Sequence, residues 1–183
     1  MNHVAIAAIE TSSIAQGTVV GDAMVKMADV DLVQACPISP GKYWILIGGE
    51  VGPVRASFHR GLEVAADTLL DSLFITQLHT MVLPALSGTV APEDHDALGV
   101  IETLTAAAAI VAADQAAKAA AVTLRDLRLA NGLGGKGVLF LSGDLPDVQA
   151  AVEAGRAEAL KKGLLSRSVV VPKLHLQMKQ RVF

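Results

Sequence analysis

The chain has 183 residues, of which 52% are apolar and only 3% aromatic, and its formal net charge is −3. This apolar fraction is ample for a packed core and excludes a disordered or low-complexity chain. Acidic and basic residues are mixed without a basic run, so the charge pattern offers no support for a nucleic-acid or anionic-membrane partner.

The first half of the chain reads as strand, helix, strand, strand, helix, strand. Ser12 or Ser13 can cap the first helix, and the second helix opens at Gly52-Pro53, where the missing N–H of proline is harmless. The turn Ser39-Pro40-Gly41 separates the two middle strands. The expected strands cover residues 4–9, 32–38, 42–47 and 73–78.

A polar stretch of turn formers divides the chain. Residues 87–96 read SGTVAPEDHD and predict a linker between a first domain over residues 1–86 and a second domain over residues 97–183. The linker contains acidic and histidine side chains of metal-ligand type, but a solvated charge run is the ordinary explanation in such a segment.

The second half repeats the first half. The clearest matches, at offsets of 92, 94 and 96 residues, pair Ile9-Glu10-Thr11 with Ile101-Glu102-Thr103, Gly41-Lys42 with Gly135-Lys136, and Leu78-His79 with Leu174-His175. Each two-residue step is expected between elements, where loops tolerate length changes. The chain is therefore a duplication, and the element order of each half predicts an α+β, split β-α-β ferredoxin-like fold with helices on one face of an antiparallel sheet.

The segment ANGLGGKGVL, residues 130–139, looks at first like a phosphate-binding loop. Such a loop needs a glycine, four residues, then Gly-Lys and a hydroxyl residue, with a helix following. Ala130 stands at the first glycine position, and Gly137 stands at the hydroxyl position. The segment also matches the first-half turn between two strands, so we interpret it as a hairpin connection.

The repeated residues resemble a known family, the tandem-domain shell proteins of bacterial microcompartments. The stretches that carry the resemblance are IETSSIAQGTVVGDAMVKMADVDLV, PGKYWILIGGEVGPVRAS, VIETLTAAAAIVAADQAAKAAAVTL and GGKGVLFLSGDLPDVQAAVEAG. They cover nearly the whole chain in two copies, in the standard, non-permuted order, and are similar to the single-layer T-type of propanediol utilisation. The resemblance implies two tandem BMC domains and a homotrimer that forms a flat pseudohexamer.

The resemblance implies a structural protein and not an enzyme, with no cofactor. Tiles would pack edge to edge with other shell proteins, hexamers and pentamers, and a central pore would pass small metabolites. A duplicated chain supplies both surfaces that a closed ring requires. Residues 1–10 lack the charged and apolar segments of a cleavable leader, and residues 106–113 are too short to span a bilayer. We therefore expect a cytoplasmic microcompartment shell protein with no nucleic-acid or membrane partner.

The resemblance also assigns residues to the pore and to the tile edge. In this family the hairpin after the second strand lies at the central axis, where small residues leave room for six backbones. The expected pore-lining residues are Ser39, Pro40, Gly41, Leu133, Gly134 and Gly135, flanked by the charges of Lys42 and Lys136, which would favour anionic metabolites. The expected tile-edge residues are Lys26 and Lys118 with Asp22 and Asp114, whose spacing is also that of solvated i,i+4 ion pairs.

One position departs from the family pattern. In the propanediol-utilisation relative, a cysteine directly before Pro-Gly-Lys supplies an iron–sulfur cluster on the three-fold axis, and that position here is Ser39. Cys36, the single cysteine, lies three residues earlier with opposite strand parity, so an inert thiol is expected and an internal disulfide is excluded. Two alternative functions are an electron-transfer shell protein with a cluster at Cys36, and a ferredoxin-like trimeric sensor of a small molecule.

Other repeated polar residues are interpreted as structural. His79 and His175 end equivalent strands, which predicts a structural place and not a metal site. Glu10 and Glu102 recur at strand ends, where we expect them to cap the entry of a helix and not to act in acid–base catalysis. No pair of nucleophile and base is evident in the sequence.

Overall fold

The structure is a computed structural model that describes residues 4–90 and 95–182. The first repeat contains β1 (Ala5–Thr11), α1 (Ile14–Met27), β2 (Asp31–Ile38), β3 (Lys42–Gly49), α2 (Val51–Ala65), a 3₁₀ turn (Ala66–Thr68), β4 (Leu69–Thr76) and α3 (Val82–Ser87). The second repeat contains β5 (Ala97–Thr103), α4 (Ala106–Ala119), β6 (Val122–Leu129), β7 (Gly137–Gly143), α5 (Leu145–Lys161), β8 (Leu165–Val171) and α6 (Leu176–Val182).

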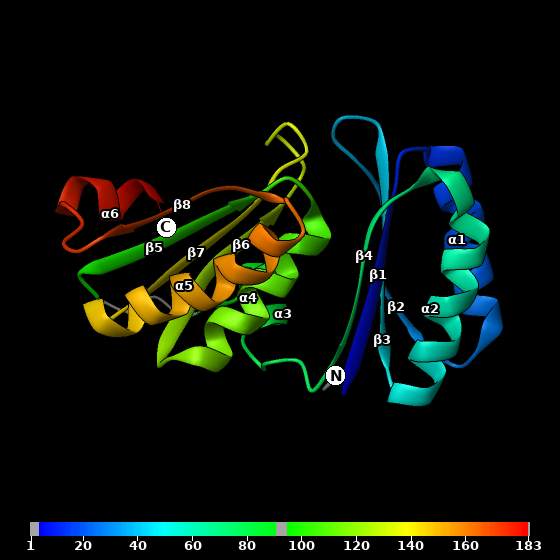
Figure 1. Cartoon of the computed structure of the whole chain (residues 1–183), viewed down its shortest axis with the longest axis horizontal. Coiled ribbons are helices and arrows are strands. Elements are labelled where there is room, and N and C mark those ends of the chain that lie inside the picture. The colour runs from blue at the N-terminus through cyan, green and yellow to red at the C-terminus, as the bar shows by residue number, and fades with distance from the viewer. Residues whose placement is uncertain (1–3, 91–94, 183) are drawn as a thin grey trace. The chain divides into compact units, whose positions relative to one another are not determined.

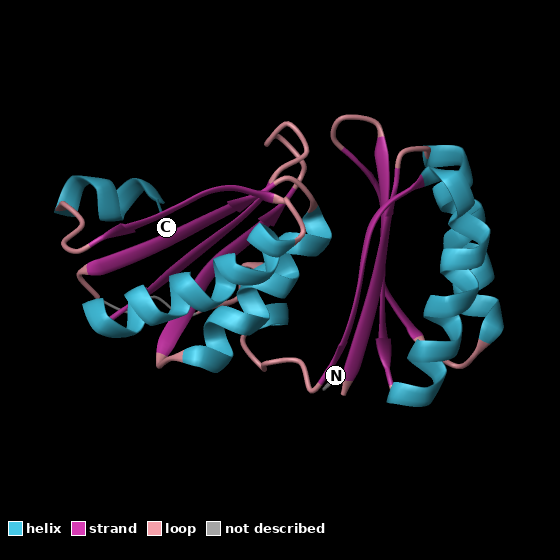
Figure 2. Cartoon of the chain, in the orientation of Figure 1, coloured by secondary structure: helices cyan, strands magenta, loops and turns pink. Residues whose placement is uncertain are grey.

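Both repeats form the predicted α+β fold. The sheet orders are β2-β3-β1-β4 and β6-β7-β5-β8, and every pairing is antiparallel. In the first repeat α1 and α2 lie side by side on one face of the sheet (Figure 1). In the second repeat α4 and α5 share one face of their sheet (Figure 2). The strand–helix order expected from the repeated sequence is thus confirmed in each half.

The core of the first repeat lies between the central strand and its two helices. All seven residues of β1 are buried, because β3 and β4 flank this strand on both sides. Ile9, Ile45 and Ile47 of the sheet pack with Met24 of α1 and Val54 of α2. The helices approach the sheet closely: a Cβ added to Gly61 of α2 would lie 2.6 Å from Ile9 Cδ1. Burial of this apolar face supplies most of the driving force for folding.

The chain divides into two compact units that do not coincide with the repeats. The first unit comprises Met1–Leu78 together with Thr105–Ala107 and Ala130–Gly135, and the second comprises His79–Leu104, Ala108–Leu129 and Lys136–Phe183. The first unit therefore includes the start of α4 and most of the turn between β6 and β7. Residues 91–94 of the expected linker lie outside the described residues.

The hairpin turns explain one of the length differences between the repeats. Ser39, Pro40 and Gly41 connect β2 to β3, whereas the longer segment of residues 130–136 connects β6 to β7. No helix follows either turn, so the interpretation of the glycine-rich segment as a hairpin connection is confirmed.

A short helix closes each repeat beyond the last strand, where the sequence had indicated no further element. His79 precedes α3 and His175 precedes α6, and the Nδ1 atom of each imidazole accepts a hydrogen bond at 3.3 Å from the backbone N–H two residues later. The two histidines therefore make the same local bond in both repeats, which confirms their structural place.

Candidate functional site

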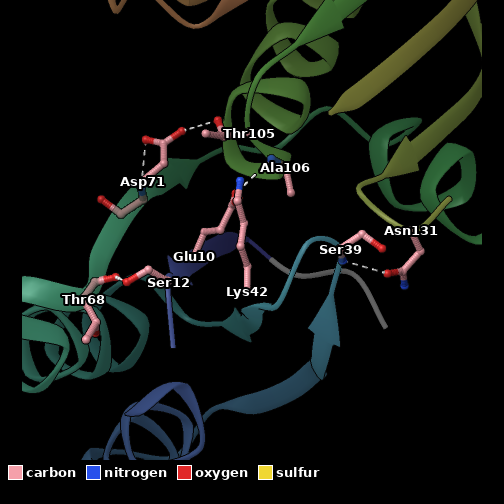
Figure 3. Close-up of polar contacts among 10 residues, drawn as sticks. Glu10, Ser12, Ser39, Lys42, Thr68, Asp71, Thr105, Ala106 and Asn131 are labelled. Atoms are coloured by element: carbon pink, nitrogen blue, oxygen red, sulfur yellow. Dashed lines mark hydrogen bonds and ion pairs between the residues drawn. The ribbon is translucent and has the colours of Figure 1, made fainter. Parts of the chain in front are cut away.

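The two hairpin turns meet inside the first unit. The backbone N–H of Ser39 donates a hydrogen bond to Oδ1 of Asn131 at 3.2 Å (Figure 3). Gly135 has a φ of +88°, and a Cβ added to it would lie 2.9 Å from Pro40 Cδ and 3.1 Å from the carbonyl oxygen of Ser39. Both the backbone conformation and the close approach therefore require glycine at this position. Three of the expected pore residues are thus in contact.

The other three expected pore residues are two exposed glycines and one half-buried leucine. Gly41 and Gly134 are exposed at positive φ, and nothing lies within 4 Å of a Cβ added to either. Leu133 is half-buried, and its backbone N–H donates to the carbonyl oxygen of Ala130 at 3.1 Å. The two glycines therefore offer exposed peptide groups without side-chain bulk.

A buried carboxylate lies beside these turns. The side chain of Glu10, at the end of β1, has no exposed surface. Its Oε1 accepts a hydrogen bond from Lys42 Nζ at 2.7 Å, and its Oε2 accepts one from the backbone N–H of Ala106 at 2.9 Å (Figure 3). Ala106 is the first residue of α4, where unsatisfied N–H groups and the helix dipole favour an anion. Each carboxylate oxygen therefore has its own partner.

The expected capping of a helix entry is confirmed for Glu10, at a different helix, and is wrong for Glu102, whose partners in the described residues are Lys136 and Ser166. The sequence pattern predicted capping of a helix entry, and α1 is the helix that follows Glu10 in the chain. The structure instead places Glu10 at the start of α4, 96 residues away from it. The spacing of residues contains no signal for a partner at this distance.

Sequence reasoning missed a second acidic residue at the same helix start. Asp71 of β4 lies opposite Glu10 in the sheet register, and its Oδ2 accepts a hydrogen bond from the hydroxyl of Thr105 at 2.5 Å (Figure 3). Thr105 directly precedes α4 and is 6% exposed. Nearby, the backbone N–H of Ser12 donates to the carbonyl oxygen of Thr68 at 2.8 Å. Two neighbouring strands thus direct carboxylates toward one helix N-terminus.

The lysines expected to flank the pore are both ion-paired. Lys42 is 18% exposed and bonds to the fully buried Glu10. Lys136 is 45% exposed and lies 3.1 Å from Oε2 of Glu102, which is 36% exposed. The hydroxyl of Ser166 also donates to this oxygen, at 3.5 Å. The same pair therefore recurs in both repeats, but only the second copy is open to solvent.

The residues expected at the tile edge form two ion pairs in different environments. Lys26 Nζ lies 2.7 Å from Asp22, and both side chains are exposed. Lys118 Nζ lies 2.6 Å from Asp114, whose side chain is only 1% exposed. Oδ1 of Asp114 accepts a hydrogen bond from the backbone N–H of His79 at 2.9 Å. The i,i+4 pairing is confirmed in both helices, and in α4 the aspartate also holds the chain in front of α3.

The single cysteine, Cys36, is half-buried and lies outside the hairpin turn. Cys36 lies on β2 opposite Trp44 of β3, and burial raises the pKa of its thiol above the ordinary value. A cluster is bound by thiolates, which a raised pKa disfavours. Within the ranges that the structure describes, no group of three or more His, Cys, Asp or Glu side chains is arranged to hold a metal ion.

None of the helices in the described ranges has the length and apolar character of a membrane span.

Comparison with known families identifies the repeated fold. The BMC domain matches residues 5–78 and, a second time, residues 97–174. The chain belongs to the BMC domain family. Each of the two matches spans the four strands and two main helices of one repeat. The resemblance seen in the repeated sequence is therefore confirmed, and the chain is a tandem BMC-domain protein.

Individual BMC relatives agree with this assignment. The chain is 42% identical to the bacterial microcompartment shell protein PduT of Citrobacter freundii, with 95% of each chain covered. It is 31% identical over 104 residues to the carboxysome shell protein CsoS1B of Halothiobacillus neapolitanus, which covers 55% of this chain and 93% of that protein. The chain is thus a structural, non-enzymatic shell protein of a bacterial microcompartment.

Solved structures of BMC proteins share the fold along most of the chain. A microcompartment protein from Desulfitobacterium hafniense DCB superposes with a TM-score of 0.86 at 41% identity, covering 96% of this chain and 98% of that one. A fused permuted hexameric shell protein of the RMM microcompartment gives a TM-score of 0.63 at 26% identity, covering 85% of this chain and 81% of that one. Their similarity extends over both repeats of the present chain.

Proposed function

We propose that three copies of this shell protein form a flat pseudohexameric tile with a central pore that passes small metabolites. The observation that carries the proposal is the close approach of the two hairpin turns, where Gly135 has no room for a Cβ beside Ser39 and Pro40. Crowding of this kind is expected where several backbones converge on an axis. Three duplicated chains would supply six such turns.

The pore of this tile would be lined mainly by peptide groups. Gly41 and Gly134 are exposed, and Ser39 is half-buried with its N–H directed to Asn131. Of the flanking lysines, Lys136 carries the more accessible charge, because Lys42 is largely covered and bonded to Glu10. Any preference of the pore for anionic metabolites should therefore depend on Lys136. Replacing it by glutamine should lower anion flux through assembled shells, and unchanged flux would remove this part of the proposal.

The edge of the tile would use α1 and α4. Lys26 is 72% exposed and borders a hollow of about 300 Å³ that Asp22, Ala23, Met27 and Arg60 also line. Lys118 is less exposed, at 37%, and is held by the buried Asp114. We propose that these lysines contact neighbouring shell proteins, the hexamers and pentamers of the same shell, while their aspartates orient them.

Negative-stain electron microscopy of the purified chain at low salt tests the assembly. The wild-type protein should form discs of pseudo-six-fold outline that pack into sheets. Lys26→Ala combined with Lys118→Ala should leave the discs intact and abolish the sheets. The control Lys161→Ala, at another exposed lysine in an ion pair, should keep both the discs and the sheets. Particles that never associate laterally, even when mixed with other shell proteins, would contradict the tile and would favour the sensor alternative.

The electron-transfer alternative has little support from the residues present. Ser39 stands in the turn, and the thiol of Cys36 is disfavoured as a thiolate by burial. A brown chromophore in protein purified without oxygen, absent from the Cys36→Ala variant, would revive this alternative. We expect a colourless protein.

A further inference from the structure

The two repeats place equivalent carboxylates in unequal surroundings. Glu10 and Glu102 occupy the same position in the central strands β1 and β5, and each bonds to the equivalent lysine. The Glu10 side chain is completely buried, whereas 36% of the Glu102 side chain is exposed. Only Glu10 receives a backbone N–H, that of Ala106, among the residues described. Glu102 is therefore a copy of Glu10 that lacks one of its partners.

The starts of the two equivalent helices show the complementary difference. Ala106 begins α4, is fully buried, and donates its N–H to Glu10. Ile14 begins α1 at the matching position and is 42% exposed. In the part of the chain that the structure describes, the N–H of Ile14 has no acceptor. The first N–H groups of a helix need outside acceptors and carry partial positive charge, so an acidic partner is favourable there. Among the described residues, α4 has such a partner and α1 does not.

The partly exposed carboxylate of Glu102 and the exposed start of α1 correspond to the two partners of the contact between Glu10 and Ala106. We propose that Glu102 of one copy accepts a hydrogen bond from the backbone N–H of Ile14 in a second copy, as Glu10 does from Ala106 within the chain. A second copy is the occupant that fits, since the same chain carries both sides and the charges are complementary. The contact is heterologous, so it links copies head to tail. The inference rests on the proposed assembly and names one hydrogen bond between neighbouring copies in it.

A neighbouring pair supports the same alignment with donor and acceptor exchanged. Within the first unit, Asp71 accepts a hydrogen bond from the hydroxyl group of Thr105. The equivalent register position on β8 holds Arg167, and the residue before α1 is Ser13. A guanidinium group only donates, and a hydroxyl oxygen has two lone pairs, of which Ser13 uses one for Gln16 N–H. Arg167 of one copy can therefore donate to Ser13 of the next.

Ile14→Pro tests the helix side of the contact. Proline is well tolerated as the first residue of a helix, so the substitution removes the N–H and leaves the helix start intact. Ser13 has φ −126° and ψ 124°, an extended conformation that suits the residue before proline. Ile14→Ala is the matched control, because it removes the exposed side chain and keeps the N–H.

Glu102→Ala and Glu102→Gln test the carboxylate side. Glutamine keeps an acceptor oxygen and loses the charge, so its effect should lie between those of the wild type and of alanine. Glu153→Ala is the control, since Glu153 is a 71% exposed glutamate whose ion pair with Arg156 lies on α5. Far-UV circular dichroism of each variant verifies folding before its association is measured.

Sedimentation velocity over a dilution series measures the concentration at which half of the chains are associated. We expect this concentration to rise about tenfold in Ile14→Pro and in Glu102→Ala, and to change less than about twofold in both controls. The double variant Ile14→Pro/Glu102→Ala should associate no more weakly than either single variant, because both remove the same bond.

The outcomes separate this contact from the assembly itself. A wild-type chain that stays monomeric at every concentration would overturn the assembly and the contact together. A wild-type oligomer that Glu102→Ala leaves unchanged would overturn the contact while the assembly stands. Fully additive effects of the two substitutions would also overturn it, since the two groups would then act independently.

Discussion

Lys42 Nζ lies 2.7 Å from Oε1 of Glu10, a carboxylate with no exposed surface. Lys42→Gln removes the cation and leaves the buried charge with a single backbone N–H donor. We expect a loss of roughly 3 to 5 kcal/mol in the free energy of unfolding, which is typical when one partner of a buried pair is removed. Urea denaturation at neutral pH and fixed protein concentration measures this loss.

Lys136→Gln is the internal control for this prediction. The equivalent pair with Glu102 is partly open to solvent, so its loss should cost less than about 1 kcal/mol. Equal effects of the two substitutions would mean that the burial of Glu10 does not determine the strength of its pair with Lys42.

Gly135→Ala should destabilise the junction of the two turns. Its φ of +88° is unfavourable for alanine, and the new Cβ would lie 3.1 Å from the carbonyl oxygen of Ser39, a backbone atom that cannot move freely. The expected loss is about 1 to 3 kcal/mol in the free energy of unfolding. Gly52→Ala, in the first turn of α2 with nothing within 4 Å of the added Cβ, should be neutral or slightly stabilising. Urea titrations of both variants at one protein concentration would show whether this order holds.

The C-terminal helix should depend on pH through Asp96. Lys179 of α6 donates a hydrogen bond to this carboxylate at 2.8 Å, and that bond and the lysine charge lower the pKa of Asp96 below its usual 3.8. The ionised form therefore favours the folded state. Its contribution is present above pH 3.8 and is lost as the pH falls through the lower folded-state pKa. Asp96→Asn should accordingly lower the urea midpoint at pH 7.

At a pH below the folded-state pKa of Asp96, the difference between Asp96→Asn and the wild type should disappear. Asp29→Asn removes an exposed carboxylate that makes no ion pair within the described ranges, and it should lower the midpoint less at pH 7. A midpoint difference between Asp96→Asn and the wild type that persists unchanged into strong acid would rule out the charged carboxylate as its source.

Cys36 should react slowly with alkylating reagents in the native protein. Burial raises the pKa of the thiol above its usual 9.0, so less thiolate is present near neutral pH than in an unfolded chain. We expect iodoacetamide to modify the urea-unfolded protein faster than the native protein at pH 7.5, followed by intact-protein mass spectrometry. Equal rates in the two states would contradict the protected environment.

The order of strands and helices could be predicted because the sequence contains two copies of the same pattern. Each matching segment at a constant offset supports the other, and the turn Ser39-Pro40-Gly41 identified the glycine-rich segment as its counterpart. The short helices α3 and α6 could not be predicted, because six or seven residues are too few for a periodic pattern. Pro84 also lies inside α3.

Environment was less accessible to sequence reasoning than element type. Asp22 and Asp114 share the same i,i+4 spacing to a lysine, yet one is exposed and the other is buried against the backbone of His79. The partner of Glu10 likewise depends on how distant segments come together and not on neighbouring residues. Spacing fixes which face of an element a side chain occupies, and tertiary contacts decide what that face meets.

The unequal lengths of the two hairpin turns have an evolutionary consequence. A ring built from identical single-domain chains acquires every mutation in all of its turns at once. In a duplicated chain the short Ser39–Gly41 turn and the longer glycine-rich turn are separate targets of mutation. One turn can therefore lose or gain a side chain while the other keeps its sequence and its conformation.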